Sequence, residues 1–400
     1  MELYTNAPYW LMKDGIVDTY TSLSKNITAD IAIMGAGISA ALIAYSLRNS
    51  GLSIAVADRR HVGMGSTAAS TAFLQYEIDT PMTKLTKMVG EENAVKSYRL
   101  CRKAIYDIGK ICDTLKPSFD FHMRPSLQYA SFLGHARPLH EEYEMRKRHG
   151  FAVNWLEPKD IMDGYGITAP GAICSEDGGE VNAYLLTCAL MNAVKKSGHS
   201  IHTNTNVTNI EHHRTGVTLQ TESGPTIKAK KLIIACGYES MRYLPKKIGE
   251  IHTTYALVSE PVTTKNLWRQ NSLVWETAQP YMYFRRVGRD RIILGGRDDK
   301  FHRPHTLAST VKKKTAMLQQ AFSKRMPHVT MKPDFSWSGA FAVTKDGLPY
   351  IGSIPQRPHT IFALGFGGNG ITFSAIAADM IHNILLKKKD PDLGIFSFDR

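Results

Sequence analysis

The alternation of apolar and polar positions is most regular near the N-terminus, in residues 30–58. An apolar run ends at Gly35, the chain passes Gly37, an apolar helical run begins at Ala40, and a second short apolar run ends on Asp58. This pattern predicts a strand, a tight turn, a buried helix and a second strand parallel to the first. The spacing G-x-G-x-x-A, followed by an acid about 20 positions later that can accept from a ribose hydroxyl, is typical of a dinucleotide-binding βαβ unit.

Each small residue of this motif has its own physical task. Gly35 permits the tight turn, Gly37 lets the backbone approach a pyrophosphate, and Ala40 allows the helix to pack closely on the strands. A pyrophosphate would bind the free N–H groups of the first helical turn, at Ile38 and Ser39, where the helix dipole favours an anion.

The rest of the chain separates into helical and strand-forming stretches. Apolar residues that recur every three or four positions predict helices at 92–115, 139–149, 181–196 and 307–326. Short apolar or alternating runs predict strands at 201, 207–210, 217–220 and 231–235, and an antiparallel sheet from residue 255 onward. The last segment, 363–373, predicts a strand, a glycine-rich turn and an apolar helix, which would aim backbone N–H groups at a negative charge.

Composition narrows the class of protein. A chain of 400 residues with 43% hydrophobic and 21% charged residues predicts a globular protein of two domains. The net charge of +13 is scattered over predicted helices, which favours solvated helix faces over a nucleic-acid surface, although it also suits an anionic partner or cofactor. The uncharged run at 31–47 is shorter than the roughly 20 residues of a membrane span. The five cysteines show no metal or C-x-x-C spacing, so we expect reduced thiols, no metal site and a cytoplasmic location.

Two stretches leave alternatives open. The loop after Asp58 begins with Arg59 and is rich in small residues, including Ser66, Thr67 and Ala68. It is either part of the nucleotide site or an ordinary flexible loop, and its local sequence favours neither. Tyr281, Tyr283 and Arg285 share one face of a predicted strand, where the tyrosines either line a site or pair across strands.

With these motifs in view, the chain resembles the D-amino-acid oxidase superfamily of flavoproteins, which includes glycine oxidase, sarcosine oxidase and γ-glutamylputrescine oxidase. The resemblance covers most of the chain from Asp30. It rests on GAGISA with Asp58, on residues 181–237, on the YMYFRR and ILGG strands, and above all on TKDGLPYIG (344–352) followed by GFGGNGI (365–371).

The resemblance implies an α/β fold in which a Rossmann-like FAD-binding domain with a parallel sheet is interleaved with a second α+β domain built on an antiparallel sheet. The expected FAD-binding domain comprises residues 1–90, 158–250 and 336–400. The expected substrate-binding domain comprises 91–157 and 251–335.

The C-terminal motifs imply FAD as the cofactor. In this family the last glycine-rich turn lies against the pyrimidine end of the flavin, so the backbone of this turn would stabilise the reduced, anionic flavin. The backbone of Val207 would bind the adenine. No cysteine follows Cys236, so we expect non-covalent FAD. The other residues expected at the cofactor are Gly35, Gly37, Ile38, Ser39, Ala40, Asp58, Arg59, Ser66, Thr67, Ala68, Gly237, Asp346, Gly365, Gly367, Gly368, Asn369, Gly370, Ile371 and Thr372.

The substrate side departs from the amino-acid-oxidising relatives. An arginine that clamps the substrate carboxylate in glycine oxidase-like members falls within residues 340–343, where this chain has none, and another position that can be arginine is Gly368. We therefore expect an amine substrate, or a carboxylate bound by Arg285, Arg286 or Arg297. The expected substrate-site residues are Tyr281, Tyr283, Phe341 and Arg297.

The predicted reaction is hydride transfer from the α-carbon of an amine or a secondary or N-substituted amino acid to flavin N5, followed by hydrolysis of the imine. One alternative is an oxidase that acts on a modified base of tRNA, which the basic charge motivates and which tRNA binding would test. Another is a flavin-binding protein without turnover, motivated by the missing arginines. The sequence indicates neither the electron acceptor nor the oligomeric state.

Overall fold

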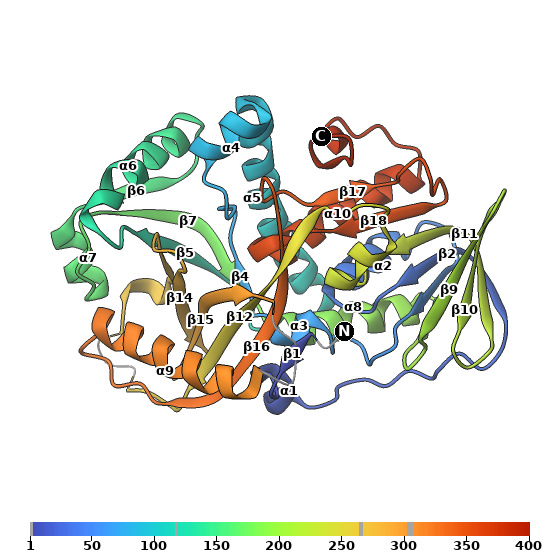
Figure 1. Ribbon diagram of the computed structural model, residues 1–400, viewed down its shortest axis with the longest axis horizontal. Helices are drawn as coiled ribbons and strands as arrows, with labels where there is room; N and C mark the ends of the chain where they lie inside the picture. The colour runs from blue at the N-terminus through green and yellow to red at the C-terminus, as the bar shows by residue number, and fades with distance from the viewer. Residues whose placement is uncertain (1–2, 117–118, 264–266, 302–306) are drawn as a thin grey trace.

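The computed structural model describes residues 3–116, 119–263, 267–301 and 307–400, and these build two sheets that stand side by side (Figure 1). One sheet is largely parallel and the other largely antiparallel. The α/β class expected from the sequence is confirmed. In the described part of the chain, no helix is long and apolar enough to cross a membrane, and no group of side chains is suited to hold a metal ion.

The largely parallel sheet has the order β17-β18-β11-β2-β3-β8, and all neighbours after β17 run parallel. The hairpin of β9 and β10 extends from β11 at the right of Figure 1. Because β2 and β3 are buried almost throughout, they read as continuous apolar runs rather than alternating ones. The strands are β2 (Ile27–Met34), β3 (Ile54–Ala57), β8 (Ser200–His202), β9 (Val207–His213), β10 (Gly216–Thr221), β11 (Thr226–Ile234), β17 (Tyr350–Gly352) and β18 (Thr360–Leu364).

Helices cover one face of this sheet. The helix of the first βαβ unit packs between two later helices, which places segments from the two ends of the chain side by side. Every residue of this helix except Ser46 is buried, so it shows little amphipathic pattern. The three helices are α2 (Ile38–Leu47), α8 (Ala183–Lys196) and α10 (Gly370–Leu385).

The second sheet has the order β1-β16-β12-β15-β14-β13-β5-β7-β4, with β6 also paired to β7. Its neighbours are antiparallel except for β13 and β5. The strands are β1 (Tyr4–Thr5), β4 (Phe73–Leu74), β5 (His122–Tyr129), β6 (Val153–Leu156), β7 (Ala172–Glu180), β12 (Gly249–Ser259), β13 (Leu273–Glu276), β14 (Met282–Val287), β15 (Arg291–Lys300) and β16 (Pro333–Thr344).

Helices also surround the second sheet. The apolar side chains of α7 and α9 form a core with one of its faces. The helix predicted at 139–149 begins six residues earlier in the structure. Residues 133–138 are exposed or half-buried, so they show no apolar pattern from which the first turns could be predicted. The remaining helices are α1 (Tyr9–Asp14), α3 (Ser66–Ala69), α4 (Met82–Val89), α5 (Glu91–Leu115), α6 (Leu133–Arg148), α7 (Pro158–Tyr165), α9 (Leu307–Arg325), and the 3₁₀ turns η1 (Gly237–Tyr243), η2 (Arg269–Asn271), η4 (Gly367–Asn369) and η5 (Leu393–Phe396).

Four strands join a different sheet from the one their predicted domain implies. Residues 1–90, 158–250 and 336–400 were expected with the FAD-binding domain, but β1, β4, β7 and the part of β16 from residue 336 onward belong to the largely antiparallel sheet. The pairing of β16 with β12 along its whole length is a contact between distant segments, which a local pattern does not specify. The division of the chain into domains stays a prediction.

Candidate active site

A cavity of about 750 Å³ lies where the two sheets meet. Four parallel strands, β2, β3, β11 and β18, end at it, and the residues that follow them, Gly35, Asp58, Ala235 and Gly365, are on its lining. Ligands of open α/β sheets bind at this edge, outside the carboxyl ends of the strands. Residues from β12, β13, β14 and β16 close the other side, so both sheets contribute to one site.

The first glycine turn has the expected geometry. Gly35 has φ +112°, and a Cβ there would lie 2.4 Å from the carbonyl oxygen of Ala235, so no side chain fits. Gly37 caps α2, and the N–H of Ile38 donates to Thr67 Oγ1 at 3.0 Å. Ala40 is fully buried behind the turn and packs the helix rather than lining the cavity.

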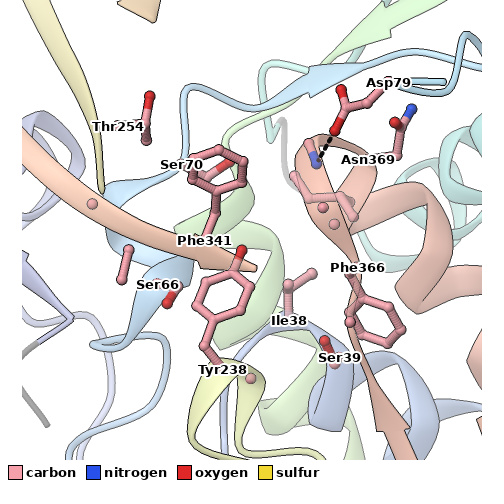
Figure 2. A pocket seen from close by; sticks show the side chains of 18 of the residues that line it. Ile38, Ser39, Ser66, Ser70, Asp79, Tyr238, Thr254, Phe341, Phe366 and Asn369 are labelled. Carbon is pink, nitrogen blue, oxygen red and sulfur yellow. Dashed lines mark hydrogen bonds between the residues drawn. The ribbon is translucent and has the colours of Figure 1, made fainter. Parts of the chain in front are cut away.

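Two serines on this side of the cavity differ in their partners (Figure 2). The hydroxyl of Ser39 is hydrogen-bonded to Ser374 Oγ on α10 at 2.7 Å, so it links two helices. The hydroxyl of Ser66 is buried, lines the cavity and lacks a hydrogen-bond partner in the described part of the chain. Ser66 is the first residue of α3, and an orphaned hydroxyl on the lining suits a phosphate oxygen.

The carboxylate of Asp58 is already held by the backbone. Oδ2 accepts from the N–H of Ala36 and Oδ1 from the N–H of Arg60, both at 2.7 Å. Burial raises the pKa of this carboxyl above its usual range, against the lowering effect of these two bonds. A carboxylate has further lone pairs, so the predicted ribose contact is compatible with this geometry.

The loop that follows Asp58 is part of the cavity wall. It folds into the short helix α3, and Ser66 and Thr67 are on the lining. Ala68 is fully buried and lies off the lining, and its expected cofactor contact stays a prediction. Arg59 donates to Glu239 Oε1 at 2.8 Å on the lining.

The predicted adenine end and the last glycine-rich turn both line the cavity. Val207, expected at the adenine, and Gly237 line one part of the cavity. The lining residues of the glycine-rich turn are Gly365, Gly367, Gly368, Asn369, Gly370 and Ile371. The side chain of Asn369 donates to the carbonyl oxygens of Gln75 at 3.0 Å and Glu77 at 2.8 Å. It therefore fastens the segment after β4 against the turn.

Two further residues that were expected at the cofactor, Asp346 and Thr372, lie off the cavity lining. Asp346 is buried away from the cavity, where its carboxylate pairs with Arg400 at 2.9 Å and accepts from the N–H of Leu348 at 3.0 Å. Arg400 holds the pKa of this carboxyl below its usual range, although burial opposes it. Thr372 is also buried, off the lining, with its hydroxyl donated to the carbonyl oxygen of Asn369. Both residues shape the turns from behind.

The aromatic wall agrees with the sequence in part. Tyr281 and Tyr283 line the cavity with ring centroids 5.7 Å apart, and Phe341 lines it from β16. Burial raises the pKa of Tyr283 to about 12 and that of Tyr281 further, so both remain neutral phenols. Tyr238, which Figure 2 shows beside Phe341, also lines the cavity; it lies outside every motif and sequence reasoning missed it.

The arginines proposed for a substrate carboxylate are not on the cavity lining. Arg285 is 2% exposed and donates to Glu180 and to the carbonyl oxygen of Thr71. Arg286 bonds to Asn271 and to a neighbouring carbonyl, and Arg297 Nη1 donates to the Pro280 carbonyl oxygen at 3.4 Å. The strand's period of two does not show which polar groups lie opposite, and the expected substrate contact of Arg297 stays a prediction.

An acidic group that sequence reasoning missed lies on the same wall. Asp79 and Glu77 line the cavity, together with Glu142 and Arg146 from α6. Arg146 Nε donates to Glu142 Oε1 at 2.8 Å. Burial raises the pKa of this carboxyl, but the charge of Arg146 and the hydrogen bonds that it accepts outweigh burial and hold the pKa below its usual range. The segment after β4 is irregular, so no periodicity marks Asp79 or Glu77.

The residues fit FAD. The pyrophosphate could lie against Gly35 and Gly37, which have no side chain in the way. The positive end of α2 and the unpartnered hydroxyl of Ser66 would suit its negative charge. The turn at 365–371, where α10 begins, lines the cavity. The expected contacts of individual residues with FAD stay predictions.

Comparison with known proteins supports this assignment. Residues 30–383 match the family described as DAO: FAD dependent oxidoreductase. A glycine oxidase from Geobacillus kaustophilus is 24% identical, over 93% of this chain and 97% of that protein. A gamma-glutamylputrescine oxidoreductase from Escherichia coli is 22% identical, over 92% of this chain and 85% of that protein.

Solved structures show the same fold. The crystal structure of the Geobacillus kaustophilus glycine oxidase superposes with a TM-score of 0.78 at 20% identity, covering 93% of this chain and 99% of that one. An L-alpha-glycerophosphate oxidase from Mycoplasma pneumoniae with FAD bound gives a TM-score of 0.73 at 17% identity, over 91% and 97% of the two chains. With the family matched over most of its length, the chain belongs to the DAO family of FAD-dependent oxidoreductases.

Proposed function

We propose that this enzyme oxidises an amine, or a secondary or N-substituted amino acid, at the carbon bound to nitrogen. The neutral amine loses a hydride from this carbon and a proton from nitrogen, and the resulting imine adds water to give a carbonyl compound and a smaller amine. FAD, when bound, supplies the two-electron acceptor. Hydride loss from a neutral amine requires no protein base at the carbon, so we assign none.

One observation carries the choice of an amine over a simple α-amino acid. The substrate wall presents neutral phenols and carboxylates, while Arg285, the best candidate for a carboxylate clamp, is buried in bonds to Glu180 and Thr71. A substrate carboxylate at Gly368 would meet the carboxylate of Asp79. Like charges at this distance inside a protein are strongly unfavourable.

The protein's own groups position and shield the reacting carbon. Tyr281, Tyr283 and Phe341 form an apolar wall with phenolic donors, which would orient the amine and exclude bulk water until the imine leaves.

A single-turnover experiment tests the reaction. FAD-loaded protein mixed anaerobically with excess N-methylbutylamine should release one carbonyl equivalent for each flavin reduced. A reduced flavin without a carbonyl product would contradict oxidation at carbon followed by hydrolysis.

A further inference from the structure

The carboxylate of Asp79 occupies the space beside the last glycine-rich turn. Its Oδ2 accepts a hydrogen bond from the backbone N–H of Gly368 at 2.9 Å (Figure 2). A Cβ at position 368 would lie 2.7 Å from Asp79 Oδ1 and 3.2 Å from its Cγ. Because Gly368 has no side chain, the carboxylate of Asp79 can occupy the space beside it. Any side chain at position 368 would displace this carboxylate.

This carboxylate lacks a cation. Within residues 3–116, 119–263, 267–301 and 307–400, Asp79 has no ion pair, and its hydrogen bond is the one from Gly368. Its side chain is on the cavity lining and keeps accessible surface, while desolvation by the neighbouring protein raises the pKa of the carboxyl. The phenols of Tyr238 and Tyr281 are near enough to interact with its charge, but both are neutral. Desolvation disfavours the charged form of this carboxyl, so a cation bound in the cavity beside it would stabilise the carboxylate.

The neighbouring ion pairs do not supply that partner. Arg146 is bonded to Glu142, and its Nη1 also lies 3.8 Å from Glu77 Oε1. Glu77 is 4% exposed, and neither of its carboxylate oxygens has a hydrogen-bond partner in the described part of the chain. Two carboxylates, those of Glu142 and Glu77, thus share the guanidinium of Arg146. Lys84, also on the lining, makes no ion pair with Asp79 among the described residues.

We propose that Asp79 binds a second, non-reacting ammonium group of the substrate, so that the enzyme acts on diamines. This inference rests on the proposed function. A carboxylate stabilises the protonated form of an amine, whereas the nitrogen that loses a hydride must be neutral. Asp79 is therefore suited to the far nitrogen and not to the reacting one. A monoamine would leave the carboxylate unpaired, and an α-amino acid would place like charges together.

Binding and flavin reduction by three ligands of similar length test this proposal. FAD-loaded wild type, Asp79→Asn and the control Asp163→Asn would be titrated anaerobically with 1,4-diaminobutane, n-butylamine and 4-aminobutanoate, following the flavin spectrum. Asp163 is exposed on α7, so its variant has the same change in net charge far from the cavity. An asparagine at 79 keeps an oxygen that can accept from Gly368, which preserves the turn.

Wild type and Asp163→Asn should bind the diamine at least about tenfold more tightly than n-butylamine, as expected for a charge-assisted hydrogen bond, and 4-aminobutanoate most weakly. In Asp79→Asn the preference for the diamine should fall to about twofold or less. A preference that survives Asp79→Asn overturns the inference.

The two proposals fail separately. Diamine binding that depends on Asp79 but never reduces the flavin would retain the ammonium site and refute amine oxidation. Flavin reduction by both ligands with equal wild-type affinity would retain amine oxidation and refute the ammonium site. If Asp79→Asn does not retain FAD, the wild-type preference between the diamine and n-butylamine decides alone.

Discussion

Arg285 Nη1 donates to Glu180 Oε2 at 2.9 Å, across the largely antiparallel sheet from β14 to β7. Both side chains are less than a tenth exposed, and the guanidinium also donates to the carbonyl oxygen of Thr71. Glu180 in turn accepts from Arg124 Nε at 2.8 Å. Arg285 therefore fastens the loop after α3 to the sheet and is not on the cavity lining.

Replacing this arginine should destabilise the fold rather than change substrate selection. Arg285→Met leaves Glu180 with one fewer partner, and we expect the free energy of unfolding, measured by urea denaturation, to fall by about 3 kcal/mol. The control Arg137→Met removes an exposed i,i+4 pair with Glu141 and should change it little. A stable Arg285→Met protein with impaired binding of carboxylate-bearing ligands only would show that Arg285 faces the substrate after all.

The ribose contact of Asp58 can be separated from its structural bonds. Asp58→Ala should weaken FAD retention, but it also frees the N–H groups of Ala36 and Arg60. An FAD analogue whose adenosine ribose lacks both hydroxyls isolates the contact. By calorimetry on apoprotein, wild type should bind FAD more tightly than the analogue by about tenfold, and Asp58→Ala should bind the two alike. Equal discrimination in both proteins would mean that Asp58 does not contact the ribose.

The flavin should be released completely by acid. Cys236, the last cysteine of the chain, has a buried thiol whose pKa burial raises, so it is a poor nucleophile toward a flavin methyl group. Trichloroacetic acid should leave a colourless pellet and all flavin in the supernatant, measured by absorbance at 450 nm. Flavin on the washed pellet would refute non-covalent binding.

Asp298 on β15 should give stability a defined pH dependence. Burial raises the pKa of this carboxyl to about 6, and its Oδ1 lacks a hydrogen-bond partner in the described ranges. The folded state holds this proton longer than the unfolded state, so its contribution to stability falls as the pH rises from about 4 to about 6. Asp298→Asn removes this loss.

The Tm of Asp298→Asn minus that of wild type should therefore rise from about zero near pH 4 to a positive plateau above pH 6.5. The exposed Asp163→Asn variant should show no such rise. A flat difference for Asp298→Asn across this range would show that its carboxyl has an ordinary pKa in the folded protein.

The nucleotide side of the cavity follows from local sequence, and the substrate side does not. A positive φ at Gly35 and a helix that begins at Ile38 are requirements of a few consecutive residues, so a short motif specifies them. The same is true of the turn before α10. Asp346 shows what a motif cannot predict. It lies within the TKDGLPYIG motif, but its carboxylate is bonded to Arg400, 54 residues away, and nothing in the motif indicates this partner.

The substrate wall depends on contacts between distant segments. Asp79 meets Gly368 across 289 positions of the chain, and Asn369 reaches Gln75 and Glu77 across a similar separation. No pattern at either end indicates its partner. Tyr238 was missed for the same reason, since it enters the cavity from a 3₁₀ turn after β11, outside the motifs.

Rapid-mixing measurement of anaerobic flavin reduction tests the central claim, amine oxidation by this FAD enzyme, most directly. The absorbance at 450 nm would be followed with 1,4-diaminobutane, N-methylbutylamine, glycine and D-alanine at equal concentration. We predict that the first two bleach the flavin at least about tenfold faster than glycine and D-alanine, because the wall beside Gly368 presents a carboxylate in place of a cation. Faster reduction by glycine or D-alanine than by either amine would contradict the account.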